Sequence, residues 1–415
     1  MENITQILID ASNATPHIRG LSAQKKEEVL FKIASNIEDN LSSIIIENKK
    51  DLDRMVDDNP KKDRLLLNEE RILGLASSVR EVAILQDPTN QVLIEKTLPN
   101  GLFLQKKSVA LGVVGVIYEA RPNVTVDVAS LCIRSGNVCV LRGGSDADET
   151  NKILVNIIQD TLNDFGLNKN IVQLLPIDRK FVQELLTADK YVDILIPRGS
   201  QSLIDFVRKN AKVPVIETGA GVCHTYVEGS ANLEDASQIV RNAKVTRPSV
   251  CNALDTVLID KSIAADFIPM MAKLLKQDEV EIFADNESYQ LLKTLDYPLL
   301  KKAEDKDFGR EFLSLKCSVK LVEGIDEALS HIKKYSSKHS EAIVSESSYK
   351  IEIFLNEVDA AAVYANASTR FTDGGVFGLG AEIGISTQKL HARGPFALEK
   401  LVTEKWIVKG NGQVR

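Results

Sequence analysis

The sequence contains 415 residues, of which 44% are hydrophobic and 26% charged, and its formal net charge is −7. A chain of this length has room for two or three domains with cores of their own, and the composition excludes an intrinsically disordered protein. The acidic balance argues against a general nucleic-acid-binding protein, which carries a basic face. No apolar run approaches the length of a membrane span, and residues 1–6 lack the features of a secretory signal.

Cysteine usage indicates a reducing compartment. The five cysteines are odd in number, widely spaced and mostly set in apolar sequence: Cys132, Cys139, Cys223, Cys251 and Cys317. This pattern fits neither a disulfide framework nor a zinc site, and the five histidines show no metal-ligand spacing. We therefore expect a cytoplasmic protein without a bound metal.

The first part of the chain is predicted to be helical and to end in a hairpin. Residues 2–86 carry apolar positions at helical spacing, with Lys and Glu on the opposite faces. Strands are predicted at 92–98 and 102–107, because Asn100-Gly101 supplies the positive φ angles of a tight turn. An isolated two-stranded ribbon is marginal in water, so we expect the hairpin to pack against another element or another subunit.

Strands and helices then alternate, which is typical of a parallel α/β sheet. Strands are expected at 111–118, 138–141, 171–175, 192–196 and 213–216, with helices at 124–133, 148–165, 179–186 and up to 210. The strands are almost continuously apolar, as in a sheet covered on both faces. In such sheets ligands bind at the carboxyl ends of the strands.

A second α/β segment is predicted from about residue 227. Helices are expected at 233–243, 263–276 and 325–335, and strands at 256–259, 279–284, 318–322, 342–344 and 360–364. The tail is predicted to form a helix around 395–401 and a closing strand at 404–409.

One stretch, RPSVCNALD at 247–255, contains a candidate nucleophile. Cys251 lies where a proline-interrupted loop leads into a β-branched strand, and such a loop presents an exposed thiolate. Asn252 and the backbone N–H groups beside Cys251 are candidate donors to an oxyanion. The alternative is the commoner one for a single cysteine, a small buried apolar residue.

The strand ends carry one candidate phosphate site. The dinucleotide fingerprint G-x-G-x-x-G is absent. Gly199 and Ser200 form a weaker candidate, a glycine turn and a hydroxyl where a helix N-terminus favours anions. The alternative is that Ser200 is an ordinary helix N-cap.

Seven short motifs occur along the chain in this order: GVIYEARPNVT (115–125), LRGGS (141–145), PRGS (197–200), ETGAGVCH (217–224), RPSVCNA (247–253), SEAIV (340–344) and ASTRF (367–371). Each motif alone is weak. In this order, over nearly the whole chain, they resemble the aldehyde dehydrogenase superfamily, and within it the γ-glutamyl phosphate reductases (glutamate-5-semialdehyde dehydrogenases).

The resemblance implies an NADPH-dependent reduction of L-glutamyl 5-phosphate to L-glutamate 5-semialdehyde and phosphate, the second step of proline biosynthesis from glutamate. Cys251 matches the superfamily nucleophile and would form a thioester, which hydride converts to a thiohemiacetal and then to the aldehyde. Asn123 matches the asparagine of the oxyanion hole; its alternative is a cap of the following helix. Glu217 matches the base that activates water in hydrolytic relatives, and an acyl-phosphate reductase has no use for that step.

The resemblance also implies binding residues. Arg142 matches the lysine that contacts the adenosine ribose, and with Gly143, Gly144 and Ser145 it suits the 2′-phosphate of NADP(H), although Asp146 and Asp148 lie nearby. Gly199 and Ser200 match the turn that approaches the pyrophosphate. Glu311 falls where the superfamily has its nicotinamide-ribose glutamate, without the usual Phe-Gly-Pro after it.

For the substrate, Ser368, Thr369 and Arg370 match the loop that anchors the carboxylate in glutamate-semialdehyde enzymes. Arg121, Arg198 and Arg247 are candidates for the phosphate, since a guanidinium suits both anions. The alternative for each arginine is a surface salt bridge.

The predicted fold is α/β and aldehyde-dehydrogenase-like, with two parallel-sheet α/β domains and a β oligomerisation flap. We expect a nucleotide-binding domain at 1–90 and 109–225, a catalytic domain at 226–365, a flap at 91–108 and 395–415, and a return segment at 366–394. The flap predicts a homodimer or homotetramer, and the substrate implies a glutamate 5-kinase as a transient partner. Two alternatives stay open: an acylating aldehyde dehydrogenase that uses a CoA thioester, and a non-catalytic scaffold that kept the fold.

Overall fold

The structure is a computed structural model that describes residues 4–56, 62–119 and 121–415. Parts of the predicted helical layer (1–3 and 57–61) and the motif residue Ala120 lie outside the described residues. The chain divides into two compact units. The first contains residues 1–218, 378–384 and 395–415, and the second contains residues 219–377 and 385–394.

Helices open the first unit, as predicted. Several of them begin where a side chain accepts a hydrogen bond from a free backbone N–H: Ser22 from Lys25 N, and Asn68 from Arg71 N. Their buried faces carry the apolar residues at helical spacing. The helices are α1 (Thr5–Arg19), α2 (Ala23–Asp39), α3 (Leu41–Asp53), α4 (Lys62–Leu65) and α5 (Glu69–Ile84).

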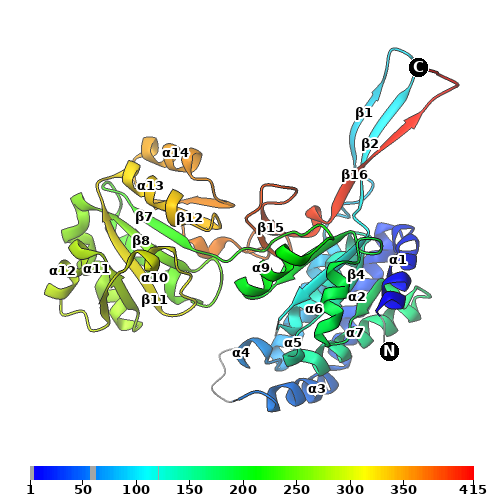
Figure 1. The fold of residues 1–415 in the computed structure, drawn as a ribbon, viewed down its shortest axis with the longest axis horizontal. Coiled ribbons are helices and arrows are strands. Elements are labelled where there is room, and N and C mark those ends of the chain that lie inside the picture. Colours follow the sequence, from blue (N-terminus) through cyan, green and yellow to red (C-terminus); the bar gives the residue numbers. More distant parts are fainter. Residues whose placement is uncertain (1–3, 57–61, 120) are drawn as a thin grey trace. The chain divides into compact units, whose positions relative to one another are not determined.

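A four-stranded parallel sheet in the order β5-β4-β3-β6 forms the centre of the first unit (Figure 1). Every residue of β3 is buried, which explains why this strand is apolar throughout. The elements are β3 (Val113–Tyr118), α6 (Pro122–Arg134), β4 (Val138–Arg142), α7 (Asp148–Asp164), β5 (Val172–Leu174), α8 (Arg179–Leu186), β6 (Ile194–Arg198) and α9 (Gln201–Asn210).

The strand predicted at 213–216 is wrong. Only Val215 forms a bridge, to Leu195. Pro214 accepts a hydrogen bond from Leu195 N at 2.8 Å but has no N–H to return. The segment therefore touches the sheet at one point and does not extend it.

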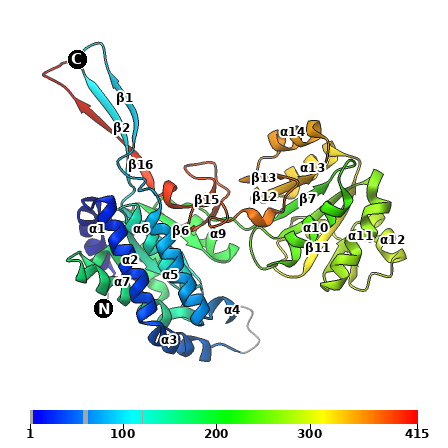
Figure 2. The same cartoon turned by 180° about the vertical axis from the view of Figure 1, so that it is seen from behind.

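A three-stranded antiparallel ribbon stands out from the first unit in Figures 1 and 2. It joins β1 (Val92–Thr97), β2 (Phe103–Ala110) and β16 (Val402–Lys409), so the predicted hairpin and closing strand are confirmed and share one sheet. Beyond β16, Gln413 Nε2 donates to Asn100 O in the hairpin turn at 3.0 Å. Leu93, Trp406 and Val408 are about half exposed on this ribbon. Its predicted role in a homo-oligomer stays a prediction.

The helix predicted at 395–401 is wrong. Phe396 lies instead in β15 (Gly394–Phe396), opposite β14 (Gly384–Ser386), and Ile383 N donates to its carbonyl at 2.9 Å. Only a 3₁₀ turn, η6 (Leu398–Lys400), follows. Long-range pairing of a buried Phe outweighed the local helical pattern here.

The second unit contains a seven-stranded parallel sheet in the order β10-β9-β11-β8-β7-β12-β13. Side chains of α10, α11 and α12 pack in one core cluster, and those of α13 and α14 in another. The sequence analysis did not predict β7, β10, α12 or α14. The elements are β7 (Cys223–Val227), α10 (Leu233–Val245), β8 (Leu254–Asp260), α11 (Ala264–Gln277), β9 (Glu281–Ala284), α12 (Asn286–Thr294), β10 (Leu300–Lys302), β11 (Lys316–Val322), α13 (Ile325–Tyr335), β12 (Ser340–Val344), α14 (Ser348–Glu357) and β13 (Ala362–Ala365). No helix in the described part of the chain is both long and apolar enough to cross a membrane.

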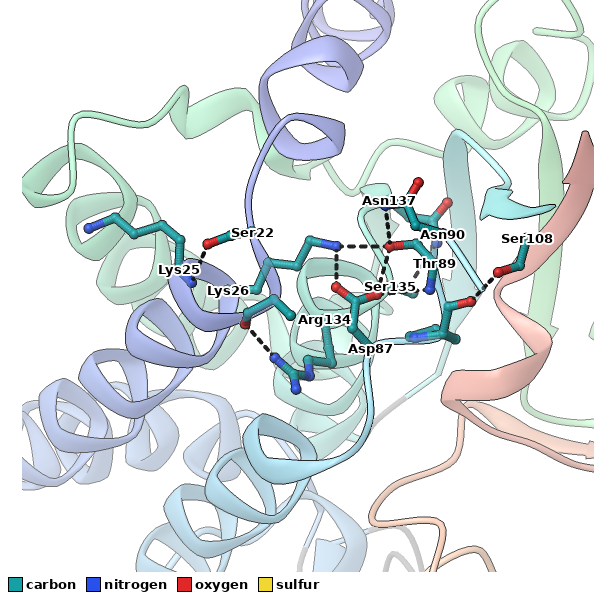
Figure 3. A network of polar contacts seen from close by, with 12 residues as sticks. Ser22, Lys25, Lys26, Asp87, Thr89, Asn90, Ser108, Arg134, Ser135 and Asn137 are labelled. Carbon is teal, nitrogen blue, oxygen red and sulfur yellow. Dashed lines mark hydrogen bonds and ion pairs between the residues drawn. The ribbon is translucent and has the colours of Figure 1, made fainter. Parts of the chain in front are cut away.

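A buried polar network lies where the ribbon joins the first unit (Figure 3). The Lys26 ammonium, 1% exposed, donates to Asp87 Oδ2 at 2.8 Å, and Asp87 Oδ1 accepts the Thr89 hydroxyl at 2.7 Å. Arg134 donates to Leu85 O at 2.8 Å. These bonds fix the segment that leads from α5 into β1.

The exit of β2 and the entry of β16 are held by one buried amide. Asn137 Nδ2 donates to Leu401 O, and Asn137 Oδ1 accepts from Gly112 N, both at 2.8 Å. Ser108 Oγ donates to Pro88 O at 2.6 Å. All three strands of the ribbon are therefore tied at their roots to α2, α6 or the turn between α6 and β4.

We expect Lys26→Met to destabilise the first unit by about 3 kcal/mol, because it leaves the Asp87 carboxylate buried without its cation. Urea unfolding followed by circular dichroism measures this. Lys25→Met is the matched control: Lys25 is about 40% exposed beside Glu28, and its loss is expected to cost under about 0.5 kcal/mol. Equal effects of the two substitutions would contradict the anchoring role of Lys26.

Candidate active site

The loop between α10 and β8 places the candidate nucleophile. A turn closes it, with Ala253 N donating to Val250 O at 3.1 Å. Cys251 is partly exposed, whereas the other four cysteines are buried. The following strand, β8, is buried along its whole length between β7 and β11. A partly exposed thiol on a loop held by a rigid strand meets the first requirement of a nucleophile.

The residues around the start of β7 pack directly against the backbone of Cys251. A Cβ atom on Gly221 would lie 1.4 Å from the Cys251 carbonyl oxygen, so only glycine fits there. The Cys223 thiol donates to the same carbonyl at 3.2 Å. Gly221 N donates to Glu311 Oε1 at 2.9 Å, which places the predicted Glu311 beside the nucleophile loop.

The predicted carboxylate-anchoring loop is bonded directly to the nucleophile loop. Thr369 Oγ1 donates to Asn252 O at 2.7 Å, and Arg370 donates to Asn252 Oδ1. Asn252 Nδ2 donates to Thr372 O at 2.8 Å and to Arg370 O at 3.3 Å. The expectation that the Asn252 side chain donates to an oxyanion is therefore wrong, since its amide is engaged with this loop. Ser368 precedes these residues and caps their 3₁₀ turn by accepting from Arg370 N.

Two guanidinium groups in the second unit influence each other. Burial lowers the pKa of Arg370, and the neighbouring Arg247 lowers it further. Arg370 Nε is buried without a hydrogen-bond partner. Within the described ranges, neither arginine has a carboxylate at ion-pair distance, so together they form a cationic pair suited to an anion.

Asn123 lies in the first turn of α6, in the first unit. Its Nδ2 donates to Asp127 Oδ2 at 3.1 Å, one turn further along the helix, and Ser78 Oγ donates to the other oxygen at 3.3 Å. Burial raises the pKa of Asp127 to about 6, against the lowering effects of Asn123, Ser78 and the nearby Arg198. Of the predicted phosphate-binding residues, Arg198 thus lies beside Asp127, and Arg121 immediately precedes α6.

The residues after β4 form a compact cationic turn. Arg142 donates to the carbonyls of Gly143 and Ile177, at 2.9 and 2.6 Å, and its Nε is buried without a partner. Burial lowers the pKa of Arg142, and Arg179 lowers it further. A Cβ on Gly143 would lie 2.3 Å from Asn151 Nδ2, so the turn is packed too closely for any larger residue. Gly144 and Ser145 continue this turn into a 3₁₀ segment, Ser145–Ala147.

Ser200 occupies the N-cap position of α9, but its side chain does not cap the helix. Its hydroxyl donates to Glu119 Oε1 at 2.8 Å, and its backbone N–H donates to Glu119 Oε2 at 3.3 Å. A Cβ on Gly199 would lie 2.8 Å from the Glu119 carboxyl carbon. A carboxylate thus already occupies the anion-favouring end of α9.

Glu217 lies one residue before the end of the long N-terminal segment of the first unit and forms an ion pair with Arg208 at 3.5 Å. Its role as a base stays a prediction. Among the described residues, no group of three or more His, Cys, Asp or Glu side chains is arranged to hold a metal ion.

The sequence reading missed two groups with a place in these sites. Asp127 stands four residues after Asn123, a spacing that puts both on one helix face, so the signal was available. Arg179, beside Arg142, follows a different strand, and no local pattern reveals that proximity.

Comparison with known proteins agrees with this architecture. The aldehyde dehydrogenase family matches residues 1–288. The γ-glutamyl phosphate reductase of Legionella pneumophila (strain Paris) is 53% identical over 98% of this chain and 97% of its own. The γ-glutamyl phosphate reductase of Chlorobaculum parvum is 52% identical over 100% and 99%. A crystal structure of that enzyme from Thermotoga maritima superposes with a TM-score of 0.94 at 39% identity, covering both chains completely. The chain belongs to the aldehyde dehydrogenase family, in the branch of the γ-glutamyl phosphate reductases.

We expect Gly221→Ala to lower kcat about 100-fold or more, because the new methyl group must displace the Cys251 backbone by more than 1 Å. Steady-state kinetics, with circular dichroism to verify folding, measures the effect. Gly309→Ala is the control, since a Cβ there meets Tyr335 at an ordinary 3.4 Å. Normal activity of the Gly221 variant would contradict the role given to this contact.

A pH-dependent stability effect is expected from Asp127. The neutral carboxyl stabilises the fold fully below the ordinary pKa of about 3.9, and this contribution is lost as pH rises through about 6. The melting temperature of Asp127→Asn minus that of the wild type should therefore increase between pH 4 and pH 7. The exposed Asp39→Asn serves as the control. A difference that falls over this range would show that the pKa of Asp127 is depressed instead.

Proposed function

We propose that this protein reduces L-glutamyl 5-phosphate to L-glutamate 5-semialdehyde and phosphate, using NADPH, in the second step of proline biosynthesis. The observation that carries the proposal is a partly exposed Cys251 on a loop that also contains Arg247 and is bonded to Arg370, whose charge Arg247 influences. The full-length relatives that bear the name γ-glutamyl phosphate reductase support it.

The Cys251 thiolate attacks the acyl carbon. A carbon–sulfur bond forms, the carbon–oxygen bond to the phosphate breaks, and phosphate leaves with the electron pair. The resulting thioester accepts a hydride at the same carbon. The thiohemiacetal then collapses, which releases the aldehyde and regenerates the thiol. Water has no part in these steps, so the reaction needs no base at Glu217.

The oxyanion that forms at each tetrahedral stage requires hydrogen-bond donors. We assign this task to the Cys251 backbone N–H and the Asn123 side-chain amide, each worth about 3 kcal/mol. Ionised Asp127 only accepts hydrogen bonds, so it holds the Asn123 amide with Nδ2 toward itself. Asp127 thereby keeps the Asn123 side chain oriented so that its NH₂ group, and not its oxygen, can donate to the oxyanion.

The substrate carries two anionic ends. We assign its α-carboxylate to Arg370 with Ser368 and Thr369, and its phosphate to cations drawn from Arg121, Arg198 and Arg247. A kinase that phosphorylates the γ-carboxylate of glutamate has to supply this labile substrate. We propose it as a separate, transient partner.

The residues at the strand ends of the first unit fit NADP(H). The unpartnered Nε of Arg142, with Arg179 close by, suits the 2′-phosphate, and we assign the turns at Gly143 and Gly199 to cofactor binding as well. Gly144, Ser145 and Ser200 extend these turns, and Glu311 is assigned to the nicotinamide ribose. When bound, NADPH supplies the hydride. The Glu119 carboxylate at the start of α9 has to yield to the pyrophosphate.

In the reverse direction, we expect NADP reduction with glutamate 5-semialdehyde to require inorganic phosphate and to vanish in Cys251→Ala, because no thioester forms without the thiol. Absorbance at 340 nm follows the reaction. Cys317→Ala, which alters a buried cysteine, is the control. Activity without phosphate would favour a hydrolytic dehydrogenase and restore Glu217 as its base, and a requirement for coenzyme A would favour the acylating alternative.

Cofactor choice is tested by Arg142→Ala. We expect the KM for NADPH to rise about tenfold or more, since one charge-assisted contact of about 1.5–3 kcal/mol is lost, while the KM for NADH changes little. Arg241→Ala, in a partly exposed pair with Asp278 of the second unit, is the control. Equal losses with both cofactors would contradict recognition of the 2′-phosphate by Arg142.

A further inference from the structure

We propose that Asn252 is a positioning residue that holds the Arg370 guanidinium ready for the α-carboxylate of the substrate, and so makes the enzyme selective for aldehydes that carry this carboxylate. The inference rests on the proposed function. It assigns a task to the residue next to the nucleophile, whose side chain does not serve the oxyanion.

The contacts of Asn252 form a clamp between two loops. Asn252 is 3% exposed, and its side-chain oxygen, side-chain nitrogen and backbone carbonyl all bond to residues 369–372. Its Oδ1 accepts from Arg370, its Nδ2 donates to the Thr372 and Arg370 carbonyls, and its own carbonyl accepts from Thr369. Four bonds thus join residues that lie 117 to 120 positions apart in the chain.

The far end of the clamped loop is equally fixed. Thr372 Oγ1 lies 2.7 Å from Ser340 Oγ, at the start of β12, and 2.6 Å from the Tyr364 hydroxyl of β13. Thr372 and Ser340 are fully buried. Arg370 therefore stands on a loop pinned to two strands, which lowers the entropy cost of binding a ligand.

An amide suits this position better than a carboxylate would. The Asn252 carbonyl orients the guanidinium without neutralising it, so the charge of Arg370 stays available to an anion. Arg370 Nε is buried with no partner, and Arg247 is a second cation close by. An unsatisfied buried donor costs free energy that a bound carboxylate recovers.

The test compares two aldehydes in the phosphate-dependent reverse reaction: glutamate 5-semialdehyde, and pentanal, which has no carboxylate. For Asn252→Ala we expect the KM for glutamate 5-semialdehyde to rise about 10- to 100-fold, the loss for one or two charge-assisted bonds, with kcat changed far less. The kcat/KM for pentanal should change less than about threefold. Arg370→Ala should give the same pattern, and the double variant should add little to it.

Asn252→Asp keeps the size of the side chain and guards against a folding failure. It should also lose discrimination, because its carboxylate pairs with Arg370 and neutralises it. Asn356→Ala, an exposed amide on α14, is the control and should behave as the wild type. Equal losses on both aldehydes, or unchanged discrimination in Asn252→Asp, would overturn the inference.

A second measurement separates this inference from the proposed function. Iodoacetamide alkylates Cys251, and L-glutamate, which carries the same α-carboxylate, should slow this reaction in the wild type and at least tenfold less effectively in Asn252→Ala. A wild type inactive on glutamate 5-semialdehyde would refute the proposed function while leaving this protection measurable. Equal protection of the two proteins, or none of the wild type, would overturn the role of Asn252.

Discussion

The backbone contact between Gly221 and Cys251 is the constraint on which the candidate catalytic centre of the second unit depends. The two chain segments approach so closely that a single methyl group would overlap the Cys251 carbonyl oxygen. Glu311 accepts a hydrogen bond from Gly221 N and is thereby linked to the nucleophile loop. The Cys223 thiol donates directly to the Cys251 carbonyl in that loop. Packing at this density tolerates no adjustment of the backbone, and catalysis depends on reacting atoms held to within about half an ångström.

Each unit contains a pair of neighbouring arginine side chains, so two positive charges lie close together in each. Arg142 with Arg179, and Arg247 with Arg370, are guanidinium pairs whose mutual repulsion and burial lower the pKa of Arg142 and of Arg370. Such pairs are unfavourable in the protein alone and become favourable when an anion binds. A bound anion would relieve the repulsion within such a pair.

Buried polar groups elsewhere fix the positions of chain segments more than they add to the free energy of unfolding. Replacing a buried ion pair such as Lys26 and Asp87 with well-packed apolar residues is often neutral, whereas removing one member alone is costly. Their value here is directional, since each bond ends at a defined atom of the segments that carry the ribbon (Figure 3). Asn252 and Asn137 act in the same way, because an amide that both donates and accepts joins separate chain segments without adding charge.

The sequence by itself determined the elements and the chemistry of single positions. Apolar spacing predicted the helices of residues 4–56 and 62–86, the alternation predicted two parallel sheets, Asn100-Gly101 predicted the hairpin, and Cys251 stood out by its loop. These signals are local, because burial of one face of a helix or strand sets the spacing of apolar residues within that segment. Only the tertiary structure decided that Asn252 and Arg370 are hydrogen-bonded. It also decided that Val215 forms a single bridge because of Pro214, and that Phe396 lies in a strand paired with β14 and not in a helix. Contacts between segments far apart in the sequence depend on strand order and on the path of loops between strands. The residues of one segment therefore do not indicate which distant segment packs against them.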